Sequence, residues 1–325
     1  MIDTNKILII GCGVSGLTCG VKLLDSGFDV EIIASKLPAD TTSSVAPAYW
    51  YPYKVYPEEK VLKWGEISYR EYATLSNDKN TGVTFKKLFK LFEKKVPRPY
   101  WTKIVKSFNE VQKSELPGGY NYGFTVEVPQ VEAPIYLKYM YNRFIELGGL
   151  VTQIEELTSL EHLYNDNRII VNCTGLGSYK LCSDSEMFPI RGQLVRTSNP
   201  GVDKIYNDED GPLAITYIVP RSDDCVLGGT AQENNWNLEV DKSISDAILS
   251  KSATLVPELR DADILEHKVG LRPGRTEVRL ESEKVTDNCT VIHNYGHGGA
   301  GFTLSWGCAR EVLEIVQSNK RLLSN

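Results

Sequence analysis

The chain has 325 residues, of which 42% are hydrophobic and 24% are charged, and its formal net charge at pH 7 is −6. This length allows two domains with a sizeable core, and the acidic balance argues against nucleic acid as a main partner. No apolar run in the sequence is long enough to predict a membrane span, so we expect no membrane partner.

The first predicted element is a β-α-β unit near the N-terminus. Residues 7–10 form a short apolar strand, and Gly11, Gly13 and Gly16 follow at G-x-G-x-x-G spacing before a stretch of helical periodicity. In this pattern the first glycine permits a tight turn, the second lets the backbone approach a pyrophosphate, and the third lets the helix press on the strand. The helix N-terminus then offers unpaired N–H groups to phosphates. The sequence therefore predicts a bound dinucleotide, and a glycine-rich turn that binds nothing is the alternative.

Residues 27–34 read as the second strand of this unit. Many dinucleotide folds carry an acid at the end of that strand for the adenosine ribose, but here the positions are Ala34, Ser35 and Lys36. We expect Ser35 to bond a ribose hydroxyl and Lys36 to reach a phosphate. Polar residues in the next loop, Thr41 and Thr42, are further cofactor candidates, with ordinary loop turns as the alternative.

The remaining elements alternate between two types of pattern. We predict helices over residues 57–80, 135–147, 243–254 and 303–318, strands over 150–155, 167–175 and 290–293, and a second glycine-rich loop over 296–301. The stretches 96–134 and 190–283 are rich in alternating and aromatic residues and predict antiparallel strands. One basic cluster, formed by Lys86, Lys87, Lys90, Lys94 and Lys95, is interpreted as a solvated helix face, with a binding site as the alternative.

This interleaving predicts that neither domain is continuous. We assign residues 1–50, 145–190 and 285–325 to an FAD-binding domain, and residues 51–144 and 191–284 to a substrate-binding domain. A nicotinamide dehydrogenase usually completes its cofactor domain within one contiguous half, so the arrangement favours FAD. The fold class is α/β plus α+β: a Rossmann-type FAD-binding domain interleaved with an antiparallel-sheet substrate domain.

The cysteines indicate the compartment. The seven cysteines form no C-x-x-C pair, which fits reduced thiols and argues against a disulfide framework or a zinc site, so no metal is expected. The first strand follows the N-terminus closely and leaves no room for a signal peptide. The expected location is cytoplasmic.

Several motifs resemble one known family, the D-amino-acid oxidases. They span nearly the whole chain in that family's order: Val171-Asn-Cys-Thr-Gly175, Arg191-Gly-Gln193, Tyr217-Ile-Val-Pro220, Leu227-Gly-Gly229, Gly270-Leu-Arg-Pro273 and His293-Asn-Tyr-Gly-His-Gly-Gly299. The resemblance implies bound FAD, a D-amino acid as substrate, molecular oxygen as electron acceptor, hydrogen peroxide as product, and a possible homodimer.

The resemblance also implies roles for individual residues. Arg272 stands in the family's carboxylate-binding position, which suits a planar guanidinium. Tyr217 matches a tyrosine whose hydroxyl assists that carboxylate, and Gly299 matches the position whose carbonyl accepts the substrate amine. His297 is expected to shape its loop, and Thr303 to donate a hydrogen bond to the flavin or to cap the last helix.

The expected cofactor contacts come from both glycine-rich loops and from scattered positions. They are Gly11, Gly13, Val14, Ser15, Gly16, Ser35, Lys36, Thr41, Thr42, Ser43, Gly175, Gln193, Gly296, Gly298, Gly299, Ala300, Gly301, Phe302 and Thr303.

Three positions depart from the family pattern. Leu213 stands where many members carry a second active-site tyrosine on a lid, so we expect a reduced lid. Tyr51 replaces a glutamine and is expected to contact the substrate. Arg221 either selects acidic side chains or is an exposed strand-end arginine.

The leading hypothesis is an oxidase of neutral or apolar D-amino acids. A D-aspartate oxidase, a glycine or secondary-amine oxidase, and a flavoprotein dehydrogenase that makes no peroxide remain as alternatives. An NAD-dependent reductase is a further class, which flavin absorbance would exclude.

Overall fold

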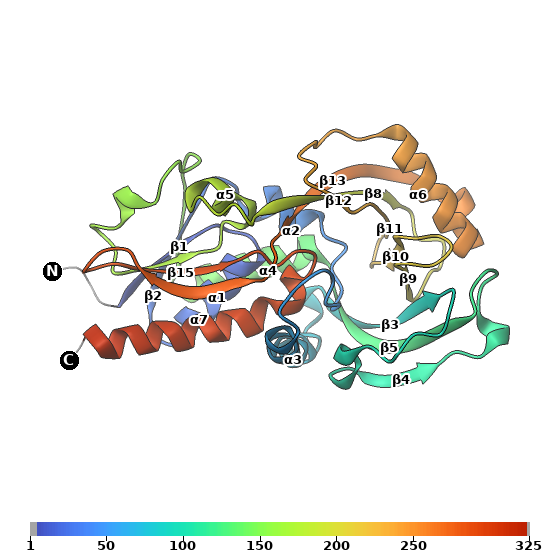
Figure 1. Cartoon of the computed structure of the whole chain (residues 1–325), viewed down its shortest axis with the longest axis horizontal. Coiled ribbons are helices and arrows are strands. Elements are labelled where there is room, and N and C mark those ends of the chain that lie inside the picture. The colour runs from blue at the N-terminus through green and yellow to red at the C-terminus, as the bar shows by residue number, and fades with distance from the viewer. Residues whose placement is uncertain (1–4, 324–325) are drawn as a thin grey trace. The chain divides into compact units, whose positions relative to one another are not determined.

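The computed structural model describes residues 5–323 and divides into two compact units. Unit 1 contains the residues up to Val83, Ala133–Phe188 and the residues from Arg272 onward, and unit 2 contains Thr84–Glu132 and Pro189–Leu271. Both units are discontinuous, so blue, green and red segments share unit 1 in Figure 1. The division places residues 51–83, 133–144 and 272–284 in unit 1, although the sequence pattern predicts them in the substrate-binding domain, and it places residues 189–190 in unit 2.

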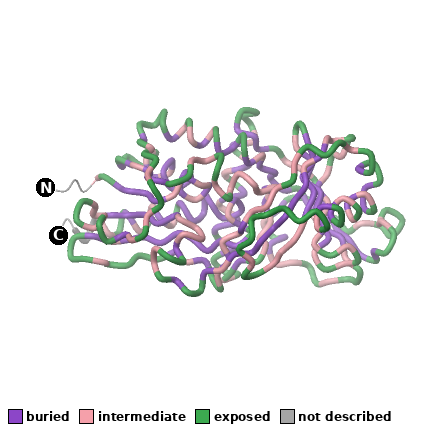
Figure 2. Tube along the Cα trace, turned by 90° about the horizontal axis from the view of Figure 1, so that it is seen from above, coloured by how far each residue is buried: buried purple, intermediate pink, exposed green. Residues whose placement is uncertain are grey.

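Unit 1 is organised around a six-stranded sheet. Its order is β14 (Arg279–Lys284), β15 (Thr290–Tyr295), β7 (Ile169–Asn172), β1 (Lys6–Ile10), β2 (Asp29–Ala34) and β6 (Leu150–Gln153). Strand β1 pairs in parallel with β2 and β7, and β14 is antiparallel to β15. Four of the five residues of β1 are buried, as expected for a strand covered on both faces, and Figure 2 shows such buried segments in purple.

The helices of unit 1 are α1 (Val14–Leu24), α2 (Thr42–Val45), α3 (Glu58–Leu75), α4 (Ala133–Glu146), α5 (Ser178–Leu181) and α7 (Gly301–Leu323). Helix α7 packs against α1 and α3, and α4 also packs against α1. Close approach is possible because of small residues: a β-carbon on Gly307 would lie 2.3 Å from the Trp64 backbone. The long helices predicted here are confirmed, but the last one begins at Gly301 rather than Thr303.

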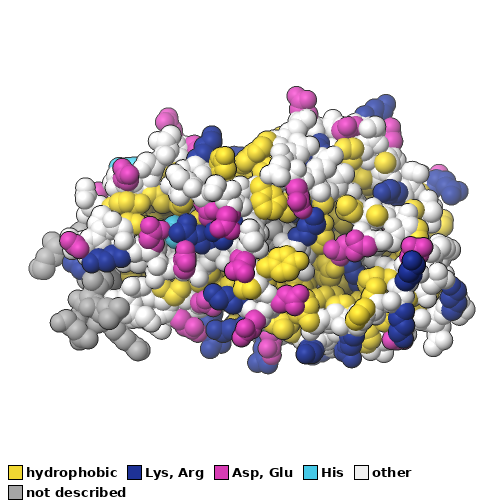
Figure 3. Space-filling view, viewed as in Figure 1, with side chains coloured by type: hydrophobic (Ala, Val, Ile, Leu, Met, Phe, Trp, Pro, Cys, Tyr) yellow, Lys and Arg dark blue, Asp and Glu magenta, His cyan; other side chains and the backbone are white. Residues whose placement is uncertain are grey.

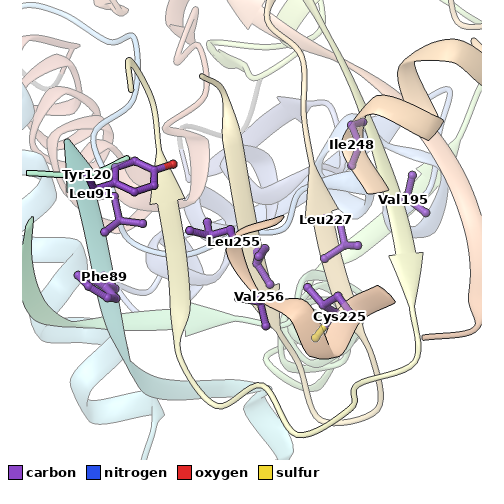
Figure 4. Packing of buried hydrophobic residues seen from close by; sticks show 11 residues of the cluster. Phe89, Leu91, Tyr120, Val195, Cys225, Leu227, Ile248, Leu255 and Val256 are labelled. Carbon is purple, nitrogen blue, oxygen red and sulfur yellow. The ribbon is translucent and has the colours of Figure 1, made fainter. Parts of the chain in front are cut away.

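Unit 2 is built on a nine-stranded sheet, in which β3 and β8 each begin, and β13 ends, with residues assigned to unit 1. The order is β12 (Gln232–Glu233), β8 (Phe188–Thr197), β11 (Cys225–Gly228), β10 (Thr216–Pro220), β9 (Ile205–Asp208), β3 (Val83–Phe92), β5 (Tyr122–Val131) and β4 (Lys106–Glu110), with β13 (Ile264–Gly274) beside β8. Helix α6 (Lys242–Leu255) packs against β10 and β11. Figure 4 shows the apolar cluster between them, including Val195, Leu227 and Ile248.

The lysine cluster is a correction to the sequence analysis. Lys86, Lys87 and Lys90 lie on strand β3, not on a helix. Lys90 is buried, and its Nζ donates to Asn207 Oδ1 at 2.7 Å and to Glu209 Oε2 at 2.9 Å. Helical and strand spacing both place several of these lysines together, and the sequence pattern did not separate the two.

Two surface observations bear on the expected partners. Among residues 5–323, no helix has the length and apolarity needed to cross a bilayer. On the face drawn in Figure 3, side chains of both charges are interspersed.

Candidate active site

The first glycine-rich loop joins β1 to α1 with very little space. Gly11 has a φ of +107°, and a β-carbon there would lie 2.6 Å from the Cys173 carbonyl oxygen. A β-carbon on Gly16 would lie 1.9 Å from the carbonyl oxygen of Gly11. Gly13 differs, because its nearest neighbour would be the Ser43 hydroxyl at 3.0 Å. Nearby backbone therefore requires glycine at both positions, the Cys173 carbonyl at position 11 and the loop's own Gly11 carbonyl at position 16, and no backbone atom requires it at position 13.

Two helices begin side by side at this loop. Gly13 is the N-cap of α1 and provides no side-chain cap. Ser43 fills this role in part, since its hydroxyl accepts a hydrogen bond from Val14 N at 3.1 Å. A β-carbon on Gly301, the first residue of α7, would lie 3.7 Å from Val14 Cγ1. The N-terminal ends of α1 and α7 thus meet, and both carry partial positive charge suited to an anion.

The other predicted cofactor contacts are spread around these helix ends. Ser35 and Lys36 follow β2 and are exposed, Thr42 is exposed at the start of α2, and Ser15 is half-buried in α1. The Thr41 hydroxyl donates to Pro38 O at 2.8 Å, which supports the loop-turn alternative for that residue.

Thr303 does not fit its predicted role as a flavin donor or helix cap. It is buried in the first turn of α7, where its hydroxyl donates to Tyr51 O at 2.9 Å and accepts from Tyr51 N at 3.1 Å. Its single hydroxyl proton is therefore already used. Phe302 packs its ring against Tyr136, with 6.0 Å between ring centroids, and so contributes its side chain to the core of unit 1.

The Thr303 contact fixes a row of three tyrosines. The rings of Tyr49 and Tyr51 are stacked with centroids 6.0 Å apart, and those of Tyr51 and Tyr53 with centroids 6.4 Å apart. We call Tyr49, Tyr51 and Tyr53 the tyrosine row. Its backbone is held by Thr303, and its three side chains present aromatic surface in unit 1.

Arg272 and Gly299 come together at the end of this row. The guanidinium carbon of Arg272 lies 6.0 Å from the centroid of the Tyr53 ring, within the range of a cation–π contact. Tyr53 Cδ1 would lie 2.5 Å from a β-carbon on Gly299, so the ring rests directly on that glycine. Gly298 N donates to Pro273 O at 2.8 Å, which ties the loop to the residue after Arg272. A guanidinium and an exposed glycine backbone are thus held at one place.

Tyr53 is the residue that the sequence analysis missed. It lies in Tyr51-Pro-Tyr53, the same segment that singled out Tyr51. Alternation along an extended segment places residues two apart on the same side, so this spacing was a usable signal. We add Tyr53 to the candidate site.

His297 shapes its loop and is a poor base. The imidazole is buried, and its Nε2 lies 3.0 Å from Asn294 Oδ1. Burial lowers the pKa of His297 to about 4, so the ring is neutral near pH 7. The other residues of this loop are constrained by its conformation: Gly296 and Gly298 have positive φ, and Ala300 is buried.

In unit 2, Tyr217 lies on β10 against a glycine pair. Its register partner is Gly228 on β11, and a β-carbon on Gly228 would overlap the Tyr217 ring at 1.9 Å from Cζ. A β-carbon on Gly229 would lie 2.7 Å from the Tyr217 hydroxyl. The Leu227-Gly-Gly229 motif therefore makes room for the tyrosine.

Two predicted contacts in unit 2 require correction. Gln193 is fully buried, and its amide bonds Asp241 O at 2.6 Å, Ser245 Oγ at 2.8 Å and Arg191 Nη2 at 2.9 Å. Its amide is therefore used by protein partners rather than free for a cofactor. Leu213, expected as a pocket residue, is partly buried and packs its side chain against the apolar cluster of unit 2.

The short segment before Tyr217 is a tight turn. The buried carboxylate of Asp208 accepts hydrogen bonds from Gly211 N at 2.6 Å, Leu213 N at 2.8 Å and the Tyr120 hydroxyl at 2.6 Å. These contacts hold the segment before Tyr217 in a compact turn, and the reduced lid stays a prediction.

Arg221 forms a structural ion pair with Asp224. Its Nε and Nη2 donate to the two carboxylate oxygens of Asp224 at 2.6 and 2.5 Å across the β10–β11 turn, and its side chain is 8% exposed. Neither sequence-based interpretation of Arg221 describes this arrangement, because the side chain is neither exposed nor available to select acidic substrates.

Unit 1 fits an extended anionic dinucleotide. Two helix N-termini meet at a loop in which Gly13 leaves the backbone open to approach, and Gly175, with a φ of +56°, follows the Cys173 carbonyl that abuts Gly11. Arg272 supplies a permanent cation for a carboxylate. These features match a redox cofactor site and a carboxylate site within one unit.

The comparisons with known proteins agree with this geometry. A family model described as FAD dependent oxidoreductase matches residues 6–315. A D-amino-acid oxidase of Rubrobacter xylanophilus is 44% identical over 312 residues, covering 96% of this chain and 95% of that protein. A D-amino-acid oxidase of Dictyostelium discoideum is 39% identical, covering 96% and 91%, and a human D-aspartate oxidase is 34% identical, covering 97% and 95%.

The fold is shared more widely than the sequence. Glycine oxidase from Geobacillus kaustophilus superposes with a TM-score of 0.80 at 18% identity, covering 96% of this chain and 94% of that chain.

Proposed function

The chain belongs to the D-amino-acid oxidase family of FAD-dependent oxidoreductases, and we propose that it oxidises D-amino acids to 2-oxo acids and ammonia while oxygen becomes hydrogen peroxide. One observation carries the proposal: Arg272 lies over Tyr53, and Tyr53 rests on the exposed Gly299. A cation and a backbone carbonyl in one place suit the two groups that all α-amino acids share.

The cofactor is held mainly by unit 1 in this proposal. The N-termini of α1 and α7, with Gly13, Val14, Ser15 and Ser43, bind the pyrophosphate. When bound, FAD supplies the redox chemistry, as acceptor of the hydride from the substrate α-carbon and as reductant of oxygen. Ser35 and Lys36, exposed after β2, contact the adenosine end.

The protein's own residues act by positioning the substrate. Arg272 binds the carboxylate in a bidentate pair. For Tyr217, which lies in unit 2, the assisting role rests on the family motif alone. The Gly299 carbonyl accepts a hydrogen bond from the amine. His297 takes no part as a base, because its imidazole is buried and already bonded to Asn294. The imino acid is then hydrolysed to the 2-oxo acid.

We further propose a preference for neutral or apolar side chains. The tyrosine row offers aromatic surface near Arg272. Arg221 donates its hydrogen bonds to Asp224 and so is not available for an acidic side chain of the substrate. A D-aspartate oxidase is the nearest alternative, since one relative carries that name. Turnover of D-alanine and D-valine well above D-aspartate supports the preference, and the reverse order contradicts it.

Two more reaction types are distinguished by equally direct tests. Turnover of sarcosine in preference to D-alanine would indicate a secondary-amine oxidase. Substrate-dependent reduction of the flavin without peroxide would indicate a dehydrogenase.

We place the protein in a reducing compartment such as the cytoplasm, because its cysteines are free thiols and six of the seven are buried. The proposal includes a homodimer, which sedimentation would test.

The deciding experiment is a peroxide-coupled screen over D- and L-amino acids with wild type, Arg272→Leu and Arg310→Leu. Arg310 is exposed on α7 and pairs with Glu314, so its loss serves as the control. We expect activity with D-amino acids for wild type and Arg310→Leu, and at least a 100-fold loss of kcat/KM for Arg272→Leu. An unchanged KM in Arg272→Leu would show that the carboxylate site lies elsewhere.

A further inference from the structure

Asp184 is a buried carboxylate that joins three separate segments of unit 1. It lies between α5 and β8, and its side chain is 6% exposed. Its Oδ2 accepts hydrogen bonds from Arg275 Nε at 3.0 Å and from the Tyr295 hydroxyl at 2.9 Å. Its Oδ1 accepts from Glu186 N at 3.1 Å. None of the roles described above uses this group.

The two side chains bound by Asp184 flank the candidate active site. Arg275 comes three residues after Arg272, just past the end of β13. Tyr295 ends β15 and immediately precedes the loop that contains Gly299. A β-carbon on Gly296 would lie 2.8 Å from Arg275 Cβ, so the loop starts against the Arg275 side chain. Asp184 therefore clamps the segment with Arg272 to the loop with Gly299.

We propose that Asp184 is a positioning residue that fixes the separation between the Arg272 guanidinium and the Gly299 carbonyl. It thereby favours ligands that carry both an amine and a carboxylate over ligands that carry a carboxylate alone. This inference rests on the proposed roles of Arg272 and Gly299. It extends them, because it assigns the spacing of the two groups to a residue that touches neither substrate nor cofactor.

Electrostatics support a charged carboxylate at this position. Burial alone would raise the pKa of Asp184, but hydrogen bonds from Tyr295 and Arg275 hold that pKa below its usual value. Arg279 adds a second guanidinium, with its Nη1 2.7 Å from the Tyr295 hydroxyl. The clamp therefore consists of charge-assisted hydrogen bonds, which hold geometry better than neutral ones.

Of the two acidic partners of Arg275, only Asp184 also binds Tyr295 and so can join the two segments. Glu186 accepts from Arg275 Nη2 at 3.1 Å, but its side chain is 50% exposed, and the hydrogen bonds of the Tyr295 hydroxyl go to Asp184 and Arg279 instead. Exposed ion pairs of this kind contribute little. Glu186→Gln is therefore a matched control for Asp184→Asn, since both changes remove one carboxylate from the same arginine.

The test compares two unreactive ligands on the FAD-loaded enzyme. 2-Aminoisobutyrate carries amine and carboxylate but no α-hydrogen, and isobutyrate lacks the amine. Their affinities are measured by calorimetry for wild type, Asp184→Asn, Glu186→Gln and Tyr295→Phe. We expect Asp184→Asn to lower the affinity for 2-aminoisobutyrate at least tenfold and the affinity for isobutyrate less than threefold. Glu186→Gln should leave both affinities within twofold of wild type. Tyr295→Phe should also lower the affinity for 2-aminoisobutyrate more than that for isobutyrate, but by a smaller factor than Asp184→Asn.

The outcomes separate the two proposals. Equal weakening of both ligands in Asp184→Asn, or no weakening, overturns the role of Asp184. If Asp184→Asn does not fold, wild-type selectivity in Tyr295→Phe overturns it instead. If wild type binds neither ligand, or Arg272→Leu binds isobutyrate as wild type does, then the proposed function itself fails.

Discussion

Replacing Gly13 and Gly16 by alanine, one at a time, separates what the first glycine-rich loop does for folding from what it does for the cofactor. A β-carbon on Gly16 would lie 1.9 Å from the Gly11 carbonyl oxygen, which is backbone and cannot rotate away. To restore van der Waals contact, α1 must move by more than about 1 Å against β1. Overpacking of this kind costs about 3 kcal/mol.

Gly13 differs in both space and conformation. Its φ is −83°, which any residue adopts, and the one close neighbour of its β-carbon would be the Ser43 hydroxyl at 3.0 Å, a side chain that can rotate, with Thr41 atoms at 3.9 Å. Gly13→Ala should therefore change the unfolding free energy of the apoprotein by less than about 1 kcal/mol. The added methyl group would still stand where the pyrophosphate approaches. We expect the FAD dissociation constant to rise at least tenfold, or about 1.4 kcal/mol.

The assay is urea denaturation of the flavin-free proteins, followed by FAD titration with fluorescence detection. Gly16→Ala should lose stability before any cofactor is added, and Gly13→Ala should lose affinity while remaining stable. Equal destabilisation of the two apoproteins, or wild-type FAD affinity in Gly13→Ala, would refute this assignment of roles.

Three further substitutions test single contacts. Thr303→Val leaves the part-buried backbone of Tyr51 without two hydrogen bonds and should lower the unfolding free energy by about 2 kcal/mol, with an unchanged flavin spectrum, because the Thr303 hydroxyl is engaged by Tyr51. For His297, the folded pKa of about 4 lies below the unfolded value of about 6.5, so the unfolded chain binds more protons between these values. The neutral ring thus stabilises the fold above pH 6.5, and this contribution, about 3 kcal/mol, is lost as pH falls toward 4; His297→Gln should flatten the denaturation profile over that interval. Arg221→Gln should cost about 1 to 3 kcal/mol through Asp224 and leave the ratio of D-aspartate to D-alanine turnover unchanged, since a changed ratio would restore Arg221 as a selector of acidic substrates.

The sequence pattern correctly predicted the β1–α1 segment of unit 1, because local geometry determines it. The strand, the three glycines and the helix near the N-terminus follow from short-range rules of strand burial and tight turns. At Gly16 the backbone contact that excludes a side chain, the Gly11 carbonyl, belongs to the motif itself, whereas at Gly11 it comes from Cys173, just after β7.

Partners distant in the sequence decided the cases in which prediction failed. Gln193 looked available for a cofactor, but Asp241 and Ser245, about fifty residues later, use its amide. Thr303 looked like a cap or flavin donor, but its partner is the backbone of Tyr51. Lys90 looked solvated, but strand β9 supplies Asn207 and the residue that follows it supplies Glu209. A polar residue in a sequence shows what it can bond, and only the fold shows which partner reaches it first.

The tyrosine row lies next to the residues proposed to bind the groups that all α-amino acids share, and it also contains a side chain that can differ with the preferred substrate. The amine and carboxylate are common to all α-amino acids, and the residues proposed to bind them are constrained by backbone: Gly299 lies against Tyr53, and Pro273 bonds the loop beside Arg272. The position of Tyr51 is set by Thr303 through its backbone N and O rather than through its ring. Its side chain can therefore change without moving the backbone that supports Tyr53. Changes in side-chain preference are accordingly expected at Tyr51, while changes at Tyr53 should impair all substrates alike.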